Sequence, residues 1–389
     1  MASVRTRCTV AALMALTAIL AGCQSPVTPT PSRTPAQPTI PVTSATATPL
    51  PTAATPSPTA TPLPTATTDA ESADDAVDRV LAISIDGLNP RAITELGAKK
   101  TPTFHRLVRE GAWTFNARTE WELTRTLPNH TGMLTGRRVD AATGGHGVTF
   151  NTDTGTTVHR AAGHYVSSVF DVVHDRGGST ALYSTKTKFD LYRRTWNANG
   201  RPDTVGQDDG RAKIDDVVLD TDAKRITGKL ARQLTADPAT FTFLHIALPD
   251  VAGHAYGFMG PEHLTSVTQT DALLGQLLDT ISGRPSLRKH TMVLLTADHG
   301  GNGPTHADPT TLQNYRIPFM AWGPGVPAGR ELYQLNPTKS DPGTSRPGYR
   351  GRQPIRNGDL ANLSTDLLDL PTVPGSEFDR PRTLDLFGS

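Results

Sequence analysis

The chain has 389 residues, 38 lysines and arginines, 37 aspartates and glutamates, and a formal net charge of +1. This balance gives no electrostatic basis for binding nucleic acid, because proteins bind nucleic acid largely through clustered basic charge. The two cysteines, Cys8 and Cys23, both lie near the N-terminus. Downstream of Cys23 we therefore expect no disulfide, no thiolate metal site and no cysteine nucleophile.

The N-terminal residues have the pattern of a bacterial lipoprotein signal. Arg5 and Arg7 form a positively charged start, residues 9–20 form a short apolar stretch, and Leu-Ala-Gly-Cys closes it at Cys23. The stretch is shorter than the roughly 20 residues that span a bilayer. We expect a signal peptide over residues 1–22, lipidation of Cys23, and export to the outer side of the cell membrane. The alternative is an ordinary secretory signal that contains a cysteine.

The composition changes sharply after the signal. Residues 24–68 are almost entirely Pro, Thr, Ala and Ser, and Arg33 is their only charge. Such a segment lacks the apolar side chains for a core, and its prolines stiffen it into an extended spacer. We predict a disordered tether over residues 23–75 and one large domain over residues 76–389.

Three apolar runs in this domain each end in an aspartate. They occupy residues 79–86, 241–250 and 291–298, and their last residues are Asp86, Asp250 and Asp298. His254 and His299 follow two of these aspartates closely. Continuous apolar runs are typical of central strands in a parallel sheet, and open α/β sheets bind ligands beyond the carboxyl ends of their strands. We therefore expect all five side chains along one edge of one sheet.

Helical and strand-like segments alternate around these runs. Helical periodicity occurs at residues 221–235 and 264–282, and further strand patterns occur at 179–186 and 316–322. The alternation predicts an α/β fold with a mostly parallel central sheet and helices on both faces. Two polar, Gly- and Pro-rich stretches, residues 193–216 and 336–357, are predicted to run over the surface.

The aspartates and histidines at the sheet edge are residue types that bind zinc. Zinc takes histidine nitrogens and carboxylate oxygens, and a catalytic zinc keeps one position open for water or substrate. Each Asp–His pair alone is weak evidence, because an aspartate at a strand end often only caps the next helix. Three carboxylates at one edge, however, repel one another unless cations neutralise them. The pattern therefore indicates an enzyme with two metal ions.

Thr126 is the candidate nucleophile. Pro128 suits the first turn of a helix, which puts Thr126 at the N-terminus of that helix. Free backbone N–H groups and the helix dipole favour an alkoxide or a phosphate at such a position. The alternative is that Thr126 is only the N-cap, although both roles are compatible.

These motifs together resemble the alkaline phosphatase superfamily and, within it, the nucleotide pyrophosphatase/phosphodiesterase (type I phosphodiesterase) family. The resemblance extends from Arg79 to about Pro374. The family's Lys-Thr-Phe-Pro-Asn-His motif is similar to residues 125–130 here. The other matching segments are Asp86-Gly87, His146-Gly-Val-Thr-Phe-Asn151, Pro249-Asp-Val-Ala-Gly-His254 and Asp298-His-Gly300.

The resemblance implies an alkaline-phosphatase-like fold and hydrolysis of phosphodiester or pyrophosphate bonds at a two-zinc site. Thr126 becomes the nucleophile that forms a phosphothreonine intermediate, and Asn151 contacts the phosphoryl oxygens. The substrate is then a small phosphate ester, for example a nucleotide. The implied ligands are Asp86, Asp298, His299 and Thr126 at one zinc, and Asp250 and His254 at the other.

The last histidine ligand departs from the family pattern. In the family it lies far downstream of Asp-His-Gly, whereas no histidine follows His306 here. Some superfamily relatives have a histidine between Asp-His-Gly and a Val-Pro-Phe-like strand, which residues 316–319 resemble. We therefore expect His306 to be the last ligand. The alternative is that His306 lies in a surface loop and that the last ligand comes from earlier in the chain.

Lys186 and Lys188 form a Lys-x-Lys pair that is similar to one in phosphonoacetate hydrolases of the superfamily. They either bind an anionic group of the substrate or form a solvated basic turn. The neutral Asn151 favours a diester, because related monoesterases meet the second negative charge with an arginine. Arg137 and Arg138 are expected to project outward. Phosphomonoesterase, phosphonate hydrolase and an inactive tethered binding module remain alternatives.

Overall fold

The computed structural model describes residues 76–198, 211–378 and 384–388. The predicted signal peptide (1–22), the lipidation of Cys23 and the predicted tether (23–75) lie outside the described residues, so they stay predictions. Among the described residues, no helix is both long and apolar enough to cross a bilayer.

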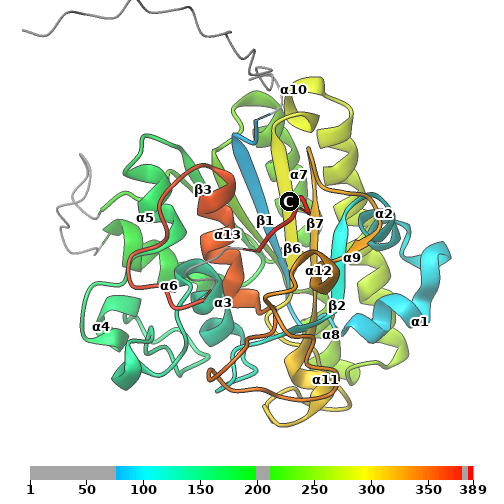
Figure 1. Cartoon of the computed structure of the whole chain (residues 1–389), viewed down its shortest axis with the longest axis horizontal. Coiled ribbons are helices and arrows are strands. Elements are labelled where there is room, and N and C mark those ends of the chain that lie inside the picture. The colour runs from blue at the N-terminus through cyan, green and yellow to red at the C-terminus, as the bar shows by residue number, and fades with distance from the viewer. Residues whose placement is uncertain (1–75, 199–210, 379–383, 389) are drawn as a thin grey trace, which may run out of the picture. The chain divides into compact units, whose positions relative to one another are not determined.

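A sheet with helices on either side forms the centre of the fold (Figure 1). The sheet has eight strands in the order β4-β3-β5-β1-β6-β7-β2-β8. The pairs of β1 with β5 and β6, of β3 with β4 and β5, and of β2 with β8 are parallel. Of these eight strands, only β7 runs against the others. The predicted mostly parallel sheet is confirmed. The strands are β1 (Arg79–Ile85), β2 (Ala112–Arg118), β3 (Thr180–Ser184), β4 (Asp216–Leu219), β5 (Phe241–Ile246), β6 (Thr291–Thr296), β7 (Arg316–Trp322) and β8 (Arg330–Glu331).

Helices cover both faces of the sheet, as Figure 1 shows. On one face α3, α5 and α13 contact one another, and a second group consists of α1, α2, α7 and α9. The helices are α1 (Pro90–Lys100), α2 (Pro102–Glu110), α3 (Thr126–Thr135), α4 (Val158–Ala162), α5 (Val169–His174), α6 (Asp190–Arg193), α7 (Ala223–Ala236), α8 (Leu248–Tyr256), α9 (Pro261–Ser282), α10 (Pro285–Arg288), α11 (Leu312–Tyr315), α12 (Leu332–Leu335) and α13 (Leu360–Leu367).

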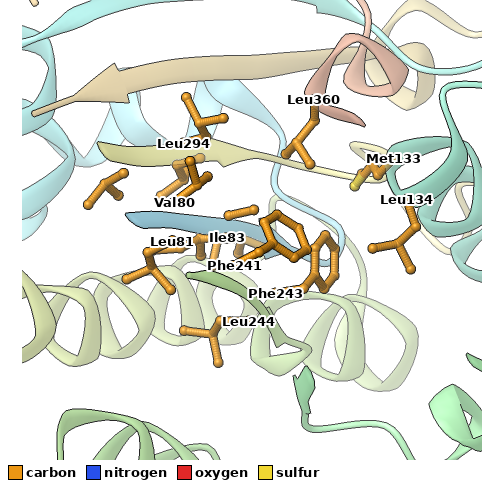
Figure 2. Close-up of a cluster of buried hydrophobic side chains, with 14 of the residues drawn as sticks. Val80, Leu81, Ile83, Met133, Leu134, Phe241, Phe243, Leu244, Leu294 and Leu360 are labelled. Atoms are coloured by element: carbon orange, nitrogen blue, oxygen red, sulfur yellow. The ribbon is translucent and has the colours of Figure 1, made fainter. Parts of the chain in front are cut away.

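The central strands are buried on both faces because apolar side chains occupy consecutive positions. Every residue of β5 and β6 is buried. In Figure 2, Leu360 of α13 and Met133 of α3 lie on one side of β1, whereas Leu81 and Leu244 lie on the other. Each fully buried side chain of this size contributes roughly 1.5–3 kcal/mol of transfer free energy. This packing fixes the strand ends from which the site is built.

The second aspartate run differs from its prediction. The strand ends at Ile246, and α8 begins at Leu248 with Pro249 in its first turn. Proline suits that position because its missing N–H is not needed there. Asp250 therefore lies in the first turn of α8 and not at the end of a strand.

The predicted surface stretches are only partly correct. Trp196 is fully buried, and its indole N–H donates to the carbonyl of Val166 at 3.0 Å. Lys213 is also buried and pairs with Asp175. In the second stretch, Arg356 is buried, where it donates to backbone carbonyls. The prediction from polar composition was wrong for these residues, because a few large side chains are buried in segments that are otherwise polar.

Candidate active site

Six aspartate and histidine side chains meet beyond the carboxyl ends of β1, β5 and β6. They form two groups, and within each group the potential ligand atoms lie within 4.8 Å of one another. Five of the six residues are buried, and His254 exposes 52% of its side chain. The first group is Asp86, Asp298 and His299, and the second is Asp250, His254 and His306. The structure thus brings together all six residues that the sequence singled out.

In the first group, three ligand atoms face one another. His299 Nε2 lies 3.4 Å from Asp86 Oδ1 and 3.2 Å from Asp298 Oδ2. The other oxygen of Asp298 accepts hydrogen bonds from the backbone N–H groups of Gly87 and His299. His299 Nδ1 lies 2.8 Å from the Gly300 carbonyl, which fixes the proton on Nδ1 and leaves a lone pair on Nε2. These three buried atoms have no hydrogen-bond partner among the described residues.

The second group is organised around Asp250. Its Oδ1 lies 3.4 Å from His254 Nε2 and 3.6 Å from His306 Nε2, and it too lacks a hydrogen-bond partner among the described residues. His306 Nδ1 lies 2.6 Å from the carbonyl of Thr124, so its Nε2 also offers a lone pair. The ring of Phe258 packs against the rings of both histidines, at centroid distances of 5.5 and 5.6 Å.

Two glycines of the motifs are required by close approaches. Gly87 has a φ of 74°, and a Cβ there would lie 3.0 Å from the Cα of Asp250. The backbone N–H of Asp250 donates to the carbonyl of Asp86 at 3.1 Å, so α8 lies directly against the end of β1. At Gly253 a Cβ would lie 2.4 Å from the ring of Phe258. Both glycines therefore let the two groups come together.

Burial determines the protonation of the site. It lowers the pKa of His299 to about 4 and that of His306 to about 3, so both rings are neutral near pH 7. Burial and repulsion by Asp86 raise the pKa of Asp298 well above its usual value. Burial alone would raise the pKa of Asp86 as well, but Lys186 and His245 hold it well below its usual range.

The donor atoms suit divalent cations. Neutral imidazole nitrogens and carboxylate oxygens are the usual ligands of zinc. Metal-binding histidines commonly donate their other ring N–H to a backbone carbonyl, as His299 and His306 do here. Buried carboxylate oxygens without partners are costly unless a cation completes them.

Thr126 is the first residue of α3. The N-cap is Arg125, which has extended backbone and makes no side-chain capping bond. The alternative that Thr126 is only an N-cap is therefore wrong. The first turn is tied to β1 by His130, whose Nδ1 lies 2.8 Å from the Thr126 carbonyl and whose Nε2 lies 2.8 Å from Ser84 Oγ. The hydroxyl oxygen of Thr126 lies 3.5 Å from Lys186 Nζ, beside the first group.

Asn151 lies next to this nucleophile segment. Its side-chain oxygen accepts a hydrogen bond from the backbone N–H of Leu127 at 3.0 Å and another from Lys188 Nζ at 3.1 Å. The amide NH₂ remains as the donor that Asn151 can offer to a substrate. His146, from the same motif, is buried and accepts a hydrogen bond from the N–H of Val148, which is a structural role.

Lys186 lies inside the site. Its Nζ donates to Asp86 Oδ2 at 2.6 Å and to Asp250 Oδ2 at 2.5 Å, and the side chain is only 17% exposed. The alternative of a solvated basic turn is therefore wrong for Lys186. Although burial alone would lower its pKa, the two carboxylates raise that pKa above its ordinary value.

The two arginines after α3 bind neighbouring loops. Arg137 donates to the carbonyls of Gly144 and Pro374, and it is buried rather than projecting outward as expected. Arg138 donates to the carbonyl of Thr143 and pairs with Glu377 at 3.1 Å.

His245 also contacts the site, although the sequence analysis assigned it no role. Its Nε2 lies 3.0 Å from Asp86 Oδ2 and its Nδ1 lies 2.9 Å from Ser184 Oγ. A histidine within the otherwise largely apolar strand β5 was the feature of the sequence that could have indicated this role. Its register partner on β1, Ser84, is also polar.

Comparison with known proteins agrees with this geometry. The family model described as type I phosphodiesterase/nucleotide pyrophosphatase matches residues 80–314. GPI ethanolamine phosphate transferase 1 of Yarrowia lipolytica is 31% identical over 127 residues, which cover 30% of this chain and 13% of that protein. The namesake protein of Aspergillus oryzae is 30% identical over 154 residues, 37% of this chain and 14% of that protein. The chain thus matches only about a seventh of the length of these relatives.

Solved structures share the fold. Murine ectonucleotide pyrophosphatase/phosphodiesterase 5, an inactive variant in complex with AMP, superposes with a TM-score of 0.54 at 15% identity over 76% of this chain and 96% of that chain. The human counterpart gives a TM-score of 0.53 at 14% identity with the same coverage. Since the family model covers more than half of the sequence, the chain belongs to the type I phosphodiesterase/nucleotide pyrophosphatase family.

Proposed function

We propose that the protein is a metal-dependent hydrolase of phosphodiester or pyrophosphate bonds, with Thr126 as its nucleophile. One observation carries the proposal: two adjacent groups of potential metal ligands lie beside a threonine at the start of a helix, and atoms of Asp86, Asp298, His299 and Asp250 in them have no hydrogen-bond partner among the described residues. Family membership supports the reaction class. The AMP bound to a structural neighbour supports a nucleotide-like ester as substrate.

Two divalent cations, most readily zinc, would be held by the two groups. Asp86, Asp298 and His299 would hold one together with the Thr126 oxygen, and Asp250, His254 and His306 would hold the other. Such ions lower the pKa of a bound hydroxyl and stabilise charge on the attacking and leaving oxygens.

The residues of the chain carry the remaining steps. The Thr126 hydroxyl gives its proton to water, its oxygen forms a bond to phosphorus, and the leaving oxygen departs with the electron pair of its bond to phosphorus. Water then hydrolyses the phosphothreonine and restores the hydroxyl. The amide NH₂ of Asn151 and the start of α3 would donate to the phosphoryl oxygens.

The charge near Thr126 favours a diester. The ammonium of Lys186 is already opposed by two carboxylates, so it adds little net positive charge for a substrate. Asn151 contributes a neutral donor. A diester carries one negative charge and needs no arginine fork, whereas a monoester carries two.

Lys188 supports a second candidate, a phosphomonoesterase or phosphonate hydrolase. Its Nζ contacts Asn151, and we propose that it binds an anionic group of the substrate. Lys186 would join it at the phosphoryl group through its position near Thr126.

A substrate panel tests the assignment. The purified protein, with its metal content measured, is assayed with a nitrophenyl nucleotide diester, nitrophenyl phosphate and phosphonoacetate. We expect the highest kcat/KM for the diester, and no turnover after chelation. A preference for phosphonoacetate or the monoester would favour the second candidate, and undiminished activity in metal-free protein would refute the metal-dependent mechanism. A phosphoethanolamine diester, assayed with and without an added alcohol as acceptor, separates hydrolysis from transfer of ethanolamine phosphate, the activity in the relatives' names.

We also propose that the protein is an exported lipoprotein. The signal over residues 1–22 would be removed, the lipid on Cys23 would anchor the chain in the membrane, and residues 23–75 would tether the domain. Mass spectrometry of the mature N-terminus tests this, since a chain that begins at an unmodified residue would contradict it.

A further inference from the structure

The ammonium of Lys186 lies between the two ligand groups. It contacts Oδ2 of Asp86 and Oδ2 of Asp250. Oδ1 of Asp86 faces His299, and Oδ1 of Asp250 faces the two histidines of the second group. The ammonium of Lys186 therefore contacts one carboxylate of each group, in each case through the oxygen that does not face the histidines. Each carboxylate divides its two oxygens between this lysine and the position of a metal ion.

The structure holds Lys186 in this position. Its backbone N–H donates to Ser184 Oγ at 3.1 Å, directly after the end of β3. The same hydroxyl contacts His245, which itself contacts Asp86. A surface lysine would instead have a mobile, hydrated side chain.

We propose that Lys186 is an internal counter-cation of the metal centre. Without metal, it stabilises the fold by neutralising Asp86 and Asp250, which are buried close to a third carboxylate, Asp298. With metal, the same ammonium repels the incoming cations and so weakens their binding. The inference rests on the proposed metal centre and adds a residue that sets its affinity.

The proposal gives opposite signs for two measurable quantities. Removing the charge lowers the stability of the metal-free protein but raises its affinity for metal. A residue that only supports the fold or aligns ligands would, on removal, lower both. A residue that only binds substrate would change KM and leave metal affinity and metal-free stability as they are.

The test compares Lys186→Met with the wild-type protein in its full length. Methionine keeps much of the length and apolar surface of lysine but has no charge. We expect the thermal midpoint of the metal-free protein to fall by about 5 °C or more. Zinc dissociation constants, measured by competition with a chromophoric chelator, should decrease roughly tenfold or more. Lys186→Arg should stay much closer to wild type in both measurements because it keeps the charge.

Lys188→Met is the matched control. It removes the same side chain two positions away, where the ammonium contacts Asn151 and not a ligand carboxylate. We expect a clearly smaller change in metal affinity and in metal-free stability than for Lys186→Met.

Unchanged or weaker zinc binding by Lys186→Met would overturn the counter-cation proposal. If this variant does not fold without metal, refolding from urea is compared with and without zinc. Rescue by zinc supports the proposal, and failure under both conditions overturns it. If wild-type protein binds no divalent cation, the metal centre itself fails, and this result is distinct from a change confined to the variant.

Discussion

Thr124 and His306 exchange two hydrogen bonds although they are 182 positions apart. His306 Nδ1 lies 2.6 Å from the Thr124 carbonyl, and the Thr124 hydroxyl donates to the His306 carbonyl at 2.5 Å. Thr124 precedes Thr126 by two residues, so the segment that carries the nucleophile also orients a histidine of the second group. This contact explains how His306 is held in the site although its loop lies soon after Asp-His-Gly.

The Thr124 hydroxyl should therefore influence metal binding. Thr124→Val loses the hydroxyl bond to the His306 backbone but keeps the carbonyl that faces the His306 ring. We therefore expect zinc binding at the second group to weaken several-fold, less than the roughly 10–100-fold that loss of a ring partner costs. Thr124→Ser keeps the hydroxyl and should stay close to wild type. Calorimetric titration of metal-free protein measures both, and equal affinities for valine and serine would contradict the role.

The nucleophile prediction concerns Thr126. Thr126→Ala should abolish turnover and phosphoenzyme formation while the metal content stays at or near that of wild type. Thr126→Ser should retain part of the turnover and part of the phosphoenzyme formation. Acid quenching with a labelled substrate, followed by peptide mapping, measures the phosphoenzyme. Near-normal turnover by the alanine variant would mean that water attacks phosphorus directly.

Metal binding at the second group should depend on both of its histidines, His254 and His306. We expect His306→Ala and His254→Ala to reduce the zinc content from about two to about one per chain, because a site with two protein ligands left binds weakly. His164→Ala is the control, since His164 is exposed. Elemental analysis after dialysis gives the content, and full zinc content in both variants would remove these histidines from the ligand set.

Acid should destabilise the fold through His146. Burial lowers the pKa of His146 to about 3, whereas the unfolded chain binds the proton near pH 6.5. Between these values the unfolded state holds the extra proton, so stability falls as pH falls, by about 1.4 kcal/mol per pH unit for one group. His146→Leu should reduce this slope by up to that amount.

Urea unfolding of metal-free protein over this pH range measures the slope. The leucine variant also loses the bond to the Val148 N–H, which lowers stability at every pH but leaves the slope unaffected. His164→Leu is the matched control at an exposed site. A slope equal to that of wild type in His146→Leu would contradict the buried, neutral state.

Alanine variants of two glycines distinguish the cost of backbone strain from the cost of a steric clash. Gly87 and Gly97 both have positive φ, 74° and 67°, but only at Gly87 would a Cβ meet another residue within 4 Å. Gly97→Ala should cost about 1–3 kcal/mol from strain alone, because its φ of 67° and ψ of 171° lie in a region that is essentially restricted to glycine. Gly87→Ala should cost more and should also weaken zinc binding, because it displaces Asp250. Equal unfolding free energies and zinc affinities for the two variants would show that α8 can move away from a Cβ at residue 87 without measurable cost.

Local sequence was sufficient to identify the central strands and five of the six candidate ligands, whereas His306 was singled out through the family resemblance. Apolar runs mark buried strands, and the aspartates after β1 and β6 follow those runs directly. The start of α8 was missed because periodicity over a few residues does not distinguish a strand end from the first turn of a helix. Asp250 was therefore assigned to the right site but to the wrong element.

The surroundings of Lys186 could not be predicted. Which carboxylates it meets depends on the strand order, in which β3 lies next to β5 and β5 next to β1. This order is a long-range property of the fold, and the residues around Lys186 contain no trace of it. The same holds for Thr124, whose partner is separated from it by most of the domain.

The parallel pairing of β1 with β5 and β6 has a consequence for how the protein folds. Parallel neighbours need crossover connections, and Gly87 and Asp298, which touch at the first group, are 211 positions apart. No short fragment of the chain can contain that group. Contacts of such high sequence separation form slowly, because a long loop must close before they stabilise anything. The first group can therefore bind metal only after the sheet is complete, which is a late and cooperative step. During refolding, the rate of metal binding at this group should equal the rate at which the native core forms.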